Sequence, residues 1–489
     1  EGTITNFELD HNLAATATWM ASPSLAGTVT LGQNLSISNN RQLSVVGRTL
    51  VAPRPYKLSN TVNRDLPIDL ETNVHRESYF GQFTVDLFDQ LYLTAAVRND
   101  GSSTFGEEDQ RNWFPKGSVA WTFTNYLGEQ PWVTFGKLRV AYGEAGTEPL
   151  AYFTSDIFNS GSILLTPISQ GTGLSPSQGG RGGLYSWIVK AADRLLPERT
   201  KEFETGFDLG LYRDKADISF TFYNAITSDV ILLTPLASST GYFTQPQNSA
   251  EFRNRGYEVA LNIRPLTSQN FAWDIGLQWA RNQSLVTQLD AATFIPIDGT
   301  NTLTPYEVAK EGSPVGVFYD FGWVRCGVSP NGMNAAVNGV DLATVCSGQP
   351  QGSLYIAANG FPVADPNQRV LGDPNPDWTG SVRSGFRYKK WEVSGLLDIR
   401  QGGDIYNGTR GALYSYGTHK DTEQRAACDG DECVGNEKTF GRGGWFDGPV
   451  VGPGAGTAVP IGENWYRQGL GAGPFAGNSE GFIGDGSYV

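Results

Sequence analysis

The sequence has few of the residues from which catalytic and metal centres are built. Its 489 residues include 3 His, 4 Cys and 2 Met, and the histidines, His11, His75 and His419, are not spaced as a metal-binding pair. The sequence therefore has too few suitably spaced histidines for a histidine-based catalytic or zinc centre to be expected. No phosphate-binding loop, dinucleotide fingerprint or serine-nucleophile motif occurs in a strand–turn–helix context. We assign no catalytic residue, no metal site and no cofactor, and we do not expect an enzyme.

Charged residues and long apolar runs are also scarce. Charged residues make up 18% of the chain and hydrophobic residues 39%, with 12% aromatic, so the chain is expected to fold. The balance of 36 Lys and Arg against 50 Asp and Glu gives a net charge of −14 without a basic stripe, which argues against a nucleic-acid partner. No window has the run of about 18 to 20 apolar residues that a membrane helix needs.

The sequence does contain strong alternation of apolar and polar residues with a period of two, which predicts β-strands. We expect about eleven strands, many of nine or ten residues, and no linker-like shift in composition divides them. The segments are 28–37, 83–87 with 91–97, 116–123, 136–143, 203–211 with 218–222, 257–263 with 271–279, and 382–388 with 391–399.

Strand length and loop asymmetry favour a membrane barrel over a soluble sandwich or propeller, whose strands also alternate. A tilted strand needs about 9 to 11 residues to cross a bilayer. Short turns such as 213–215, 265–270 and 389–390 alternate with long Gly/Ser/Pro-rich connections at 144–196, 290–380 and 401–489. Tight turns on one rim and long loops on the other are typical of outer-membrane barrels. The acidic residues expected to face the barrel interior are Glu202, Glu204, Asp208, Glu258, Asp274 and Asp398.

Several segments resemble, in order, the SusC/RagA branch of TonB-dependent outer-membrane transporters. The matching segments are VRNDGSSTFG at 97–106, WFP at 113–115, AW at 120–121, LRVAYG at 138–143, PERTKEFETGFDLGL at 197–211, FYN at 222–224, NRGYE at 254–258, GSPVG at 312–316, RVLGDPNPD at 369–377 and GGDIYN at 402–407. The resemblance implies an all-β fold, a transmembrane antiparallel β-barrel of about 22 strands with long extracellular loops.

The resemblance covers the middle and later part of that barrel. In the family, a plug and the first barrel strands precede the position matched by Glu1, and GDGSYV at 484–489 is similar to the start of a later strand. We therefore expect residues 1–489 to form a partial TonB-dependent receptor β-barrel domain, with no plug domain in this chain and with the last strands absent.

The function implied by the resemblance is active import across the bacterial outer membrane by a multi-pass β-barrel in contact with outer-membrane lipid. The substrate would be an oligosaccharide or oligopeptide. The implied partners are a SusD-like surface lipoprotein and the TonB–ExbB–ExbD complex, the latter acting through the missing N-terminal part. A structural or adhesive surface β-barrel without active transport is an alternative, and a soluble receptor or enzyme is a third.

The long connections hold the remaining candidate residues. In the oxidising location that the resemblance implies, we expect two disulfides, Cys326 with Cys346 and Cys428 with Cys433, in preference to free thiols. Asp429, Asp431 and Glu432 suit either calcium or a solvated acidic turn, so we name no metal site. Aromatic residues in Gly-rich segments are candidate substrate contacts that could instead pack the loops together. They are Tyr185, Trp187, Trp445, Phe446, Trp465 and Tyr466.

Overall fold

The computed structural model divides the chain into two compact units. Unit 1 consists of Glu1–Ile295 and Ser381–Leu397, and unit 2 of Pro296–Gly380 and Asp398–Val489. The structure describes residues 2–65, 68–106, 110–127, 130, 132–160, 184–290, 292–298, 305–328, 336–337, 340–423, 437–438, 448–460 and 480–489. In these ranges, helices are too short or too polar to cross a membrane.

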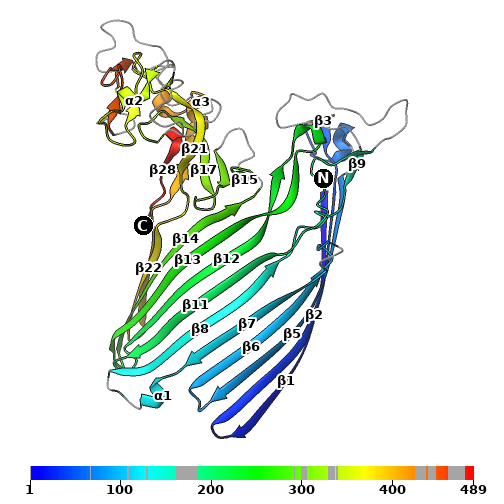
Figure 1. Cartoon of the computed structure of the whole chain (residues 1–489), viewed down its shortest axis with the longest axis vertical. Helices are drawn as coiled ribbons and strands as arrows, with labels where there is room; N and C mark the ends of the chain where they lie inside the picture. Colours follow the sequence, from blue (N-terminus) through cyan, green and yellow to red (C-terminus); the bar gives the residue numbers. More distant parts are fainter. Residues whose placement is uncertain are drawn as a thin grey trace. The chain divides into compact units, whose positions relative to one another are not determined.

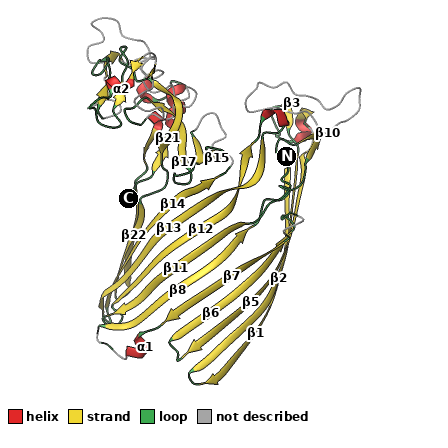
Figure 2. Ribbon diagram, in the orientation of Figure 1, coloured by secondary structure: helices red, strands yellow, loops and turns green. Residues whose placement is uncertain are grey.

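Unit 1 is built on one antiparallel sheet of twelve long, tilted strands (Figures 1 and 2). The strands follow one another in the order β1-β2-β5-β6-β7-β8-β11-β12-β13-β14-β22-β23, so neighbours in the chain are neighbours in the sheet. Their bounds are β1 Gly2–Ser22, β2 Leu25–Ser44, β5 Ile68–Leu87, β6 Leu91–Ser102, β7 Arg111–Trp121, β8 Val133–Thr147, β11 Glu198–Leu211, β12 Ala216–Pro235, β13 Thr244–Thr267, β14 Phe271–Leu289, β22 Trp378–Tyr388 and β23 Trp391–Gln401.

The predicted hairpins are confirmed, with registers that keep like residues on one face. Leu87 pairs with Leu91 across the first predicted turn, and Leu211 pairs with Ala216 across the second. β22 and β23 meet at Lys389, whose φ of 53° closes a tight turn. Short turns of this kind join strands on one rim of the sheet, which we call the short-turn rim.

The strands are longer than the sequence predicted, and β1 was not predicted. β13 has 24 residues and β1 has 21, against the nine or ten expected. The alternation of apolar and polar residues ends where a strand leaves the bilayer, but backbone pairing continues. In β2, residues 38–42 read SNNRQ and still pair with both neighbouring strands.

The connections between the long strands of unit 1 contain short helices and strands. They are β3 (Gly47–Leu50) paired with β4 (Thr61–Arg64), β9 (Phe158–Ser160) paired with β10 (Leu184–Ser186), α1 (Thr124–Leu127), and the 3₁₀ turns Leu58–Asn60 and Ser238–Thr240.

Unit 2 has a core of its own, although its sequence was expected to form long loops. Its main sheet has the order β15-β16-β17-β21, formed by β15 (Ile295–Asp298), β16 (Tyr306–Ala309), β17 (Val317–Trp323) and β21 (Ala364–Gly372). The shorter strands are β18 (Ala336–Val337), β19 (Val340–Asp341), β20 (Leu354–Tyr355), β24 (Asp404–Tyr406), β25 (Glu437–Lys438), β26 (Val450–Val451), β27 (Val459–Pro460) and β28 (Ile483–Asp485). The helices are α2 (Leu342–Val345) and α3 (Gly408–Ser415), with 3₁₀ turns at Lys420–Thr422 and η8 (Glu480–Phe482).

Two apolar clusters form the described core of unit 2. One contains Trp323, Leu354, Ile356, Tyr414, Val459 and Phe482. The other packs Val324, Leu342, Tyr355 and Val451 around the disulfide between Cys326 and Cys346, which confirms that predicted pairing. Two-residue strands between glycine and proline turns are too short to show a period, so the sequence could not distinguish this unit from irregular loops.

Candidate functional site: the two faces of the strand wall

The twelve-stranded sheet of unit 1 has one apolar face and one polar face. Strand register places a row of apolar side chains across six consecutive strands: Trp121, Leu138, Phe207, Phe220, Val259 and Trp279. The adjacent row belongs to the other face and is small or polar: Ala120, Arg139, Gly206, Thr221, Glu258 and Ala280. This division is the one expected of a wall between lipid and a polar interior.

The apolar face is exposed, which a soluble protein would avoid over so wide an area. Leu138 is 44% exposed and Leu31 is 62% exposed. On β7 the outward-facing residues run from Trp121, next to the short-turn rim, to Trp113, 61% exposed. That stretch is about nine residues, the length with which a tilted strand crosses a bilayer. We call this part of the apolar face the apolar band.

Exposed aromatic side chains lie at the short-turn rim, next to the apolar band. They are exposed on successive turns and strand ends: Trp19, Phe88, Trp121, Tyr126, Trp132, Tyr212, Tyr388 and Trp391. Tyrosine and tryptophan prefer the membrane–water interface because one end of the ring is apolar and the other can hydrogen-bond to water. The rim therefore marks one bilayer interface.

The polar face carries paired charges rather than isolated ones. Arg139 donates from Nη1 to Oε1 of Glu204 at 2.8 Å, and its Nε lies 3.3 Å from Oδ2 of Asp208. The same guanidinium donates to the hydroxyl of Thr221 at 2.8 Å. Asp208 in turn accepts from the Ser219 hydroxyl at 2.7 Å. Two of the acidic residues predicted to face the interior thus lie in one network over β8, β11 and β12.

The other described acidic residues of the predicted set also fall on the polar face. Glu258 pairs in register with Thr221. Asp274 lies 3.6 Å from the guanidinium of Arg383 on β22. Because strand alternation is enough to place these carboxylates on the polar face, they need no catalytic role.

A recess opens on the polar face where β7 and β8 part. Their pairing ends at Lys116 and Gly143. The recess has a volume of about 580 Å³, and Phe80, Arg98 and Lys116 line it. Lys116 is exposed and has no ion-pair partner among the described residues. The recess offers a cation and an aromatic ring to a polar solute, but no nucleophile beside a base.

The seam beside this recess is closed by an aromatic ring. A Cβ added to Gly146 would lie 2.1 Å from Cζ of Phe114, so the ring occupies the space that a side chain would need. The Arg199 guanidinium lies 5.0 Å from the centre of the same ring and 2.5 Å from a carboxylate oxygen of Glu144. These contacts hold β7, β8 and β11 together above the last β7–β8 pair.

Beyond the apolar band, the strands carry polar side chains on both faces. On one face, Asn34 donates to Oδ1 of Asn12 at 2.6 Å and to Oδ1 of Asp10 at 3.1 Å. On the other, Arg41 pairs with Asp69 at 2.9 Å, both about half exposed. The hydrogen bond from Arg41, with its positive charge, lowers the pKa of Asp69 below its ordinary value.

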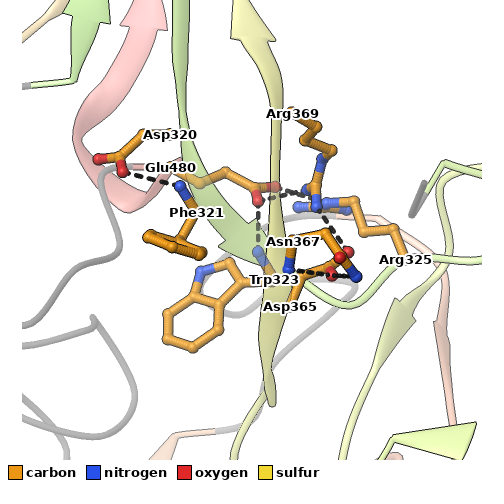
Figure 3. Close-up of polar contacts among 8 residues, drawn as sticks. All are labelled: Asp320, Phe321, Trp323, Arg325, Asp365, Asn367, Arg369 and Glu480. Carbon is orange, nitrogen blue, oxygen red and sulfur yellow. Dashed lines mark hydrogen bonds and ion pairs between the residues drawn. The ribbon is translucent and has the colours of Figure 1, made fainter. Parts of the chain in front are cut away.

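An ion-pair cluster that the sequence did not indicate lies inside unit 2 (Figure 3). The Glu480 carboxylate accepts from Nε of Arg325 at 2.6 Å and from Nη2 of Arg369 at 2.7 Å. It also accepts the backbone N–H of Trp323 at 2.7 Å. Arg369 is 3.4 Å from Asp365, and the side chains of these two residues are only 8% and 1% exposed.

A glycine makes room for this cluster. A Cβ on Gly322 would lie 2.5 Å from Oε2 of Glu480 and 2.6 Å from Nη2 of Arg369. Strand β17 therefore approaches both charged groups closely only because residue 322 has no side chain. The partners are 111 and 155 positions apart in the chain. No local pattern could have revealed them.

The predicted loop aromatics are only partly described. Tyr185 lies in β10, opposite Asn159 of β9, and its side chain is not described. Trp187 is 43% exposed and donates its backbone N–H to the oxygen of Ile157 at 2.9 Å. The other four, Trp445, Phe446, Trp465 and Tyr466, lie outside the described residues. Their role in substrate binding stays a prediction.

The second predicted disulfide and the calcium alternative also lie outside the described residues. Cys428, Cys433 and the acidic residues between them belong to the undescribed range 424–436. Among the described residues, no group of three or more His, Cys, Asp or Glu side chains is arranged to hold a metal ion.

Together, the exposed apolar band, the aromatic rim and the charge-paired polar face define a membrane-spanning β-barrel wall. Residues 2–426 match the family described as TonB dependent receptor-like, beta-barrel, and this chain belongs to that family. It is accordingly an outer-membrane protein of a family of receptors and transporters, not of enzymes.

Curated relatives share moderate sequence identity with the chain. TonB-dependent receptor P3 of Formosa agariphila is 27% identical over 341 residues, which cover 68% of this chain and 32% of the relative. TonB-dependent receptor SusC of Bacteroides thetaiotaomicron is 25% identical over 220 residues, which cover 43% of this chain and 21% of SusC. The chain therefore spans about a third or less of the length of these relatives.

A solved structure supports the fold. The structure described as the RagAB peptide transporter superposes with a TM-score of 0.66 at 17% sequence identity, covering 84% of this chain and 43% of that chain. At this identity the likeness concerns the fold alone.

Proposed function

We propose that the protein carrying this chain is an active importer of the SusC/RagA type. It takes up oligosaccharides or oligopeptides with a SusD-like lipoprotein partner and is energised through TonB. The single observation that carries the proposal is the wall itself, in which a lipid-facing apolar band backs onto a polar face with paired charges, as around Arg139. A polar interior lets large hydrated solutes pass without losing their water at a hydrocarbon surface.

The twelve strands form part of a larger wall in this proposal. β1 and β23 are the outer strands of the sheet in the described part of the chain. In lipid, each unpaired backbone group at such an edge costs several kcal/mol, on the order of 2 to 7. Further strands pairing along both edges would close the barrel at about 22 strands. Within unit 2, Arg400 at the end of β23 already exchanges two backbone hydrogen bonds with Tyr488, each 2.9 Å.

Residues outside the wall would contribute to recognition. The aromatic side chains at positions 185, 187, 445, 446, 465 and 466 remain our candidates for stacking against sugar rings or apolar peptide side chains. Of these, Trp187 has a described and exposed ring, so Trp187→Ala is the first variant to measure. It should weaken uptake of the substrate without lowering the amount of protein in the outer membrane.

The test is an uptake experiment on the full-length gene product in its own membrane. Cells with and without the gene receive fluorescently labelled oligosaccharides and oligopeptides, with and without a protonophore that removes the energy used by TonB. We expect loss of uptake of one class in the deletion strain and in protonophore-treated wild-type cells. A structural or adhesive barrel would leave uptake of both classes unchanged by the deletion, and protonophore-insensitive uptake would refute energy coupling.

The partner is tested separately. Affinity purification of the tagged full-length protein from detergent-solubilised outer membranes should recover a SusD-like lipoprotein in equal amount. Purification of an intact barrel without any lipoprotein would contradict that part of the proposal while leaving transport open to the uptake experiment.

A further inference from the structure

The turn between β22 and β23 differs in charge from the neighbouring short turns of the rim. It reads Tyr388-Lys389-Lys390-Trp391, so two lysines stand between two aromatic residues. Tyr388 is 54% exposed and Trp391 is 76% exposed. Both lysines are exposed, and neither has an ion-pair partner among the described residues.

The strand faces fix where these aromatic side chains point. Phe386, two residues before Tyr388, stacks on Trp273 of β14 with ring centres 5.2 Å apart. Trp273 pairs in register with Leu266 and lies two residues before Ile275 of the apolar face. Trp273 therefore also lies on the apolar face. Because side chains alternate along a strand, Tyr388 shares that face with Phe386. The turn is thereby held at the membrane interface by rings that point toward lipid.

The turn is also fixed against its neighbour. The backbone N–H of Lys389 donates to the carbonyl oxygen of Asn270 at 2.8 Å. Nζ of Lys389 lies 5.4 Å from the centre of the Tyr388 ring, so the lysine chain folds over the ring at the lipid-facing side. The neighbouring turn at 268–270 reads SQN and is uncharged. Nothing there neutralises the two ammonium groups.

The acidic groups of the adjoining strands and turns are on the other face or have partners of their own. Asp274 lies 3.6 Å from Arg383. Glu392 lies one residue beyond Trp391 and so on the opposite face of β23. On the next turn, Asp214 accepts from the hydroxyl of Thr134 at 2.6 Å. Within the described part of the chain, the lipid-facing side of the Lys389–Lys390 turn therefore presents two cations without an ion-pair partner.

We propose that this turn binds the headgroup of an anionic phospholipid, with the two ammonium groups on the phosphate and the Tyr388 and Trp391 rings beside the acyl chains. Long lysine side chains place their charge at the headgroup level while their methylenes stay in apolar surroundings. A free phosphate ion would use the ammonium groups alone, whereas the two exposed rings add the apolar contact that only a lipid fills. This site is independent of the transported substrate.

The experiment measures lipid selectivity of the full-length protein by native mass spectrometry. The protein is equilibrated with equal amounts of phosphatidylglycerol and phosphatidylethanolamine in detergent, and the ratio of bound lipids is compared between variants. A lysine near an anionic surface contributes a factor of about five in binding. Lys389→Gln with Lys390→Gln should therefore lower the phosphatidylglycerol preference at this site by about twenty-five-fold.

Matched variants test whether the lipid preference depends on the charge of this turn or only on the total charge of the protein. Lys389→Arg with Lys390→Arg keeps both charges and should keep the preference. Lys57→Gln with Lys201→Gln removes the same charge from exposed positions of unit 1 away from the short-turn rim and should leave the preference unchanged. Circular dichroism confirms that each variant has folded.

Two results would overturn the proposal. One is an unchanged lipid ratio in the folded Lys389→Gln, Lys390→Gln variant. The other is displacement of bound phosphatidylglycerol from the wild type by inorganic phosphate at matched ionic strength, which would assign the site to a free anion. Neither result bears on uptake, so failure here leaves the transport proposal standing.

Discussion

Replacing Glu480 by alanine should destabilise unit 2 far more than breaking an exposed ion pair of unit 1. The Glu480 side chain is 14% exposed and accepts from two arginines and one backbone N–H. Without it, among the described residues, Arg369 keeps Asp365 at 3.4 Å, and Arg325 keeps the carbonyl oxygen of Gly352 at 2.9 Å. Removing one partner of a buried ion pair costs about 3 to 5 kcal/mol, because the other charge remains buried.

The lower end of that range applies here. Arg325 is 24% exposed, so water reaches part of its guanidinium, and each arginine keeps at least one acceptor. A loss of about 3 kcal/mol corresponds to roughly a hundred-fold change in an opening equilibrium, at about 1.4 kcal/mol per factor of ten. Amide hydrogen exchange reports such local opening directly. We therefore expect protection in β17 and β21 to fall about a hundred-fold in Glu480→Ala.

The matched control is Asp69→Ala, which removes one partner of the Arg41 ion pair. Both side chains of that pair are about half exposed, and exposed ion pairs contribute little to stability. Exchange in β2 and β5 should stay unchanged. Gly322→Ala supplies a second route to the same cluster, since its Cβ would force Glu480 and Arg369 away from β17. Exchange protection in β17 and β21 that stays within about three-fold of wild type in Glu480→Ala would refute the reasoning.

Other perturbations test the remaining parts of the structure. Cys346→Ser opens a disulfide that joins residues 20 positions apart and should lower the unfolding free energy of unit 2 by about 3 kcal/mol, measured by denaturant-dependent proteolysis. Val140→Arg places a charge on the apolar band and should cost about 2 to 4 kcal/mol in folding into lipid vesicles, whereas Ala141→Arg, on the polar face, should fold like wild type. Gly256→Ala would place a Cβ 2.3 Å from the ring of Tyr223 and should cost about 1 to 3 kcal/mol in the same folding assay. Equal folding of the two arginine variants would contradict the assignment of the faces.

Local pattern was sufficient for the strands that lie within the bilayer. Alternation around Phe83, Phe207 and Val259 predicted the hairpins and the face each side chain occupies, because lipid on one side and water on the other impose the period directly. The same alternation placed Glu204 and Asp208 on the polar face, although it could not show that Arg139 lies between them.

The alternation of apolar and polar residues was a poorer guide to the strand ends that lie outside the bilayer. Residues 38–42 of β2 read SNNRQ and are polar on both faces, so the sequence showed no period there although the backbone still pairs, as Asn40 does with Asn6 and Thr72. β1 was missed although its Phe7, Leu9 and Leu13 occupy alternate positions. The loop aromatics at 445–446 and 465–466, and the Cys428–Cys433 pairing, remain predictions because these positions lie outside the described residues.

By itself the sequence determined the class of this protein, because a strand in a membrane must alternate and the ordered motifs from 97–106 to 402–407 identify the family's wall. Only the tertiary structure decided which distant groups meet. The Glu480 carboxylate reaches Arg325 and Arg369 through folding of segments more than a hundred residues apart. Such contacts depend on packing in three dimensions, which leaves no periodic trace along the chain.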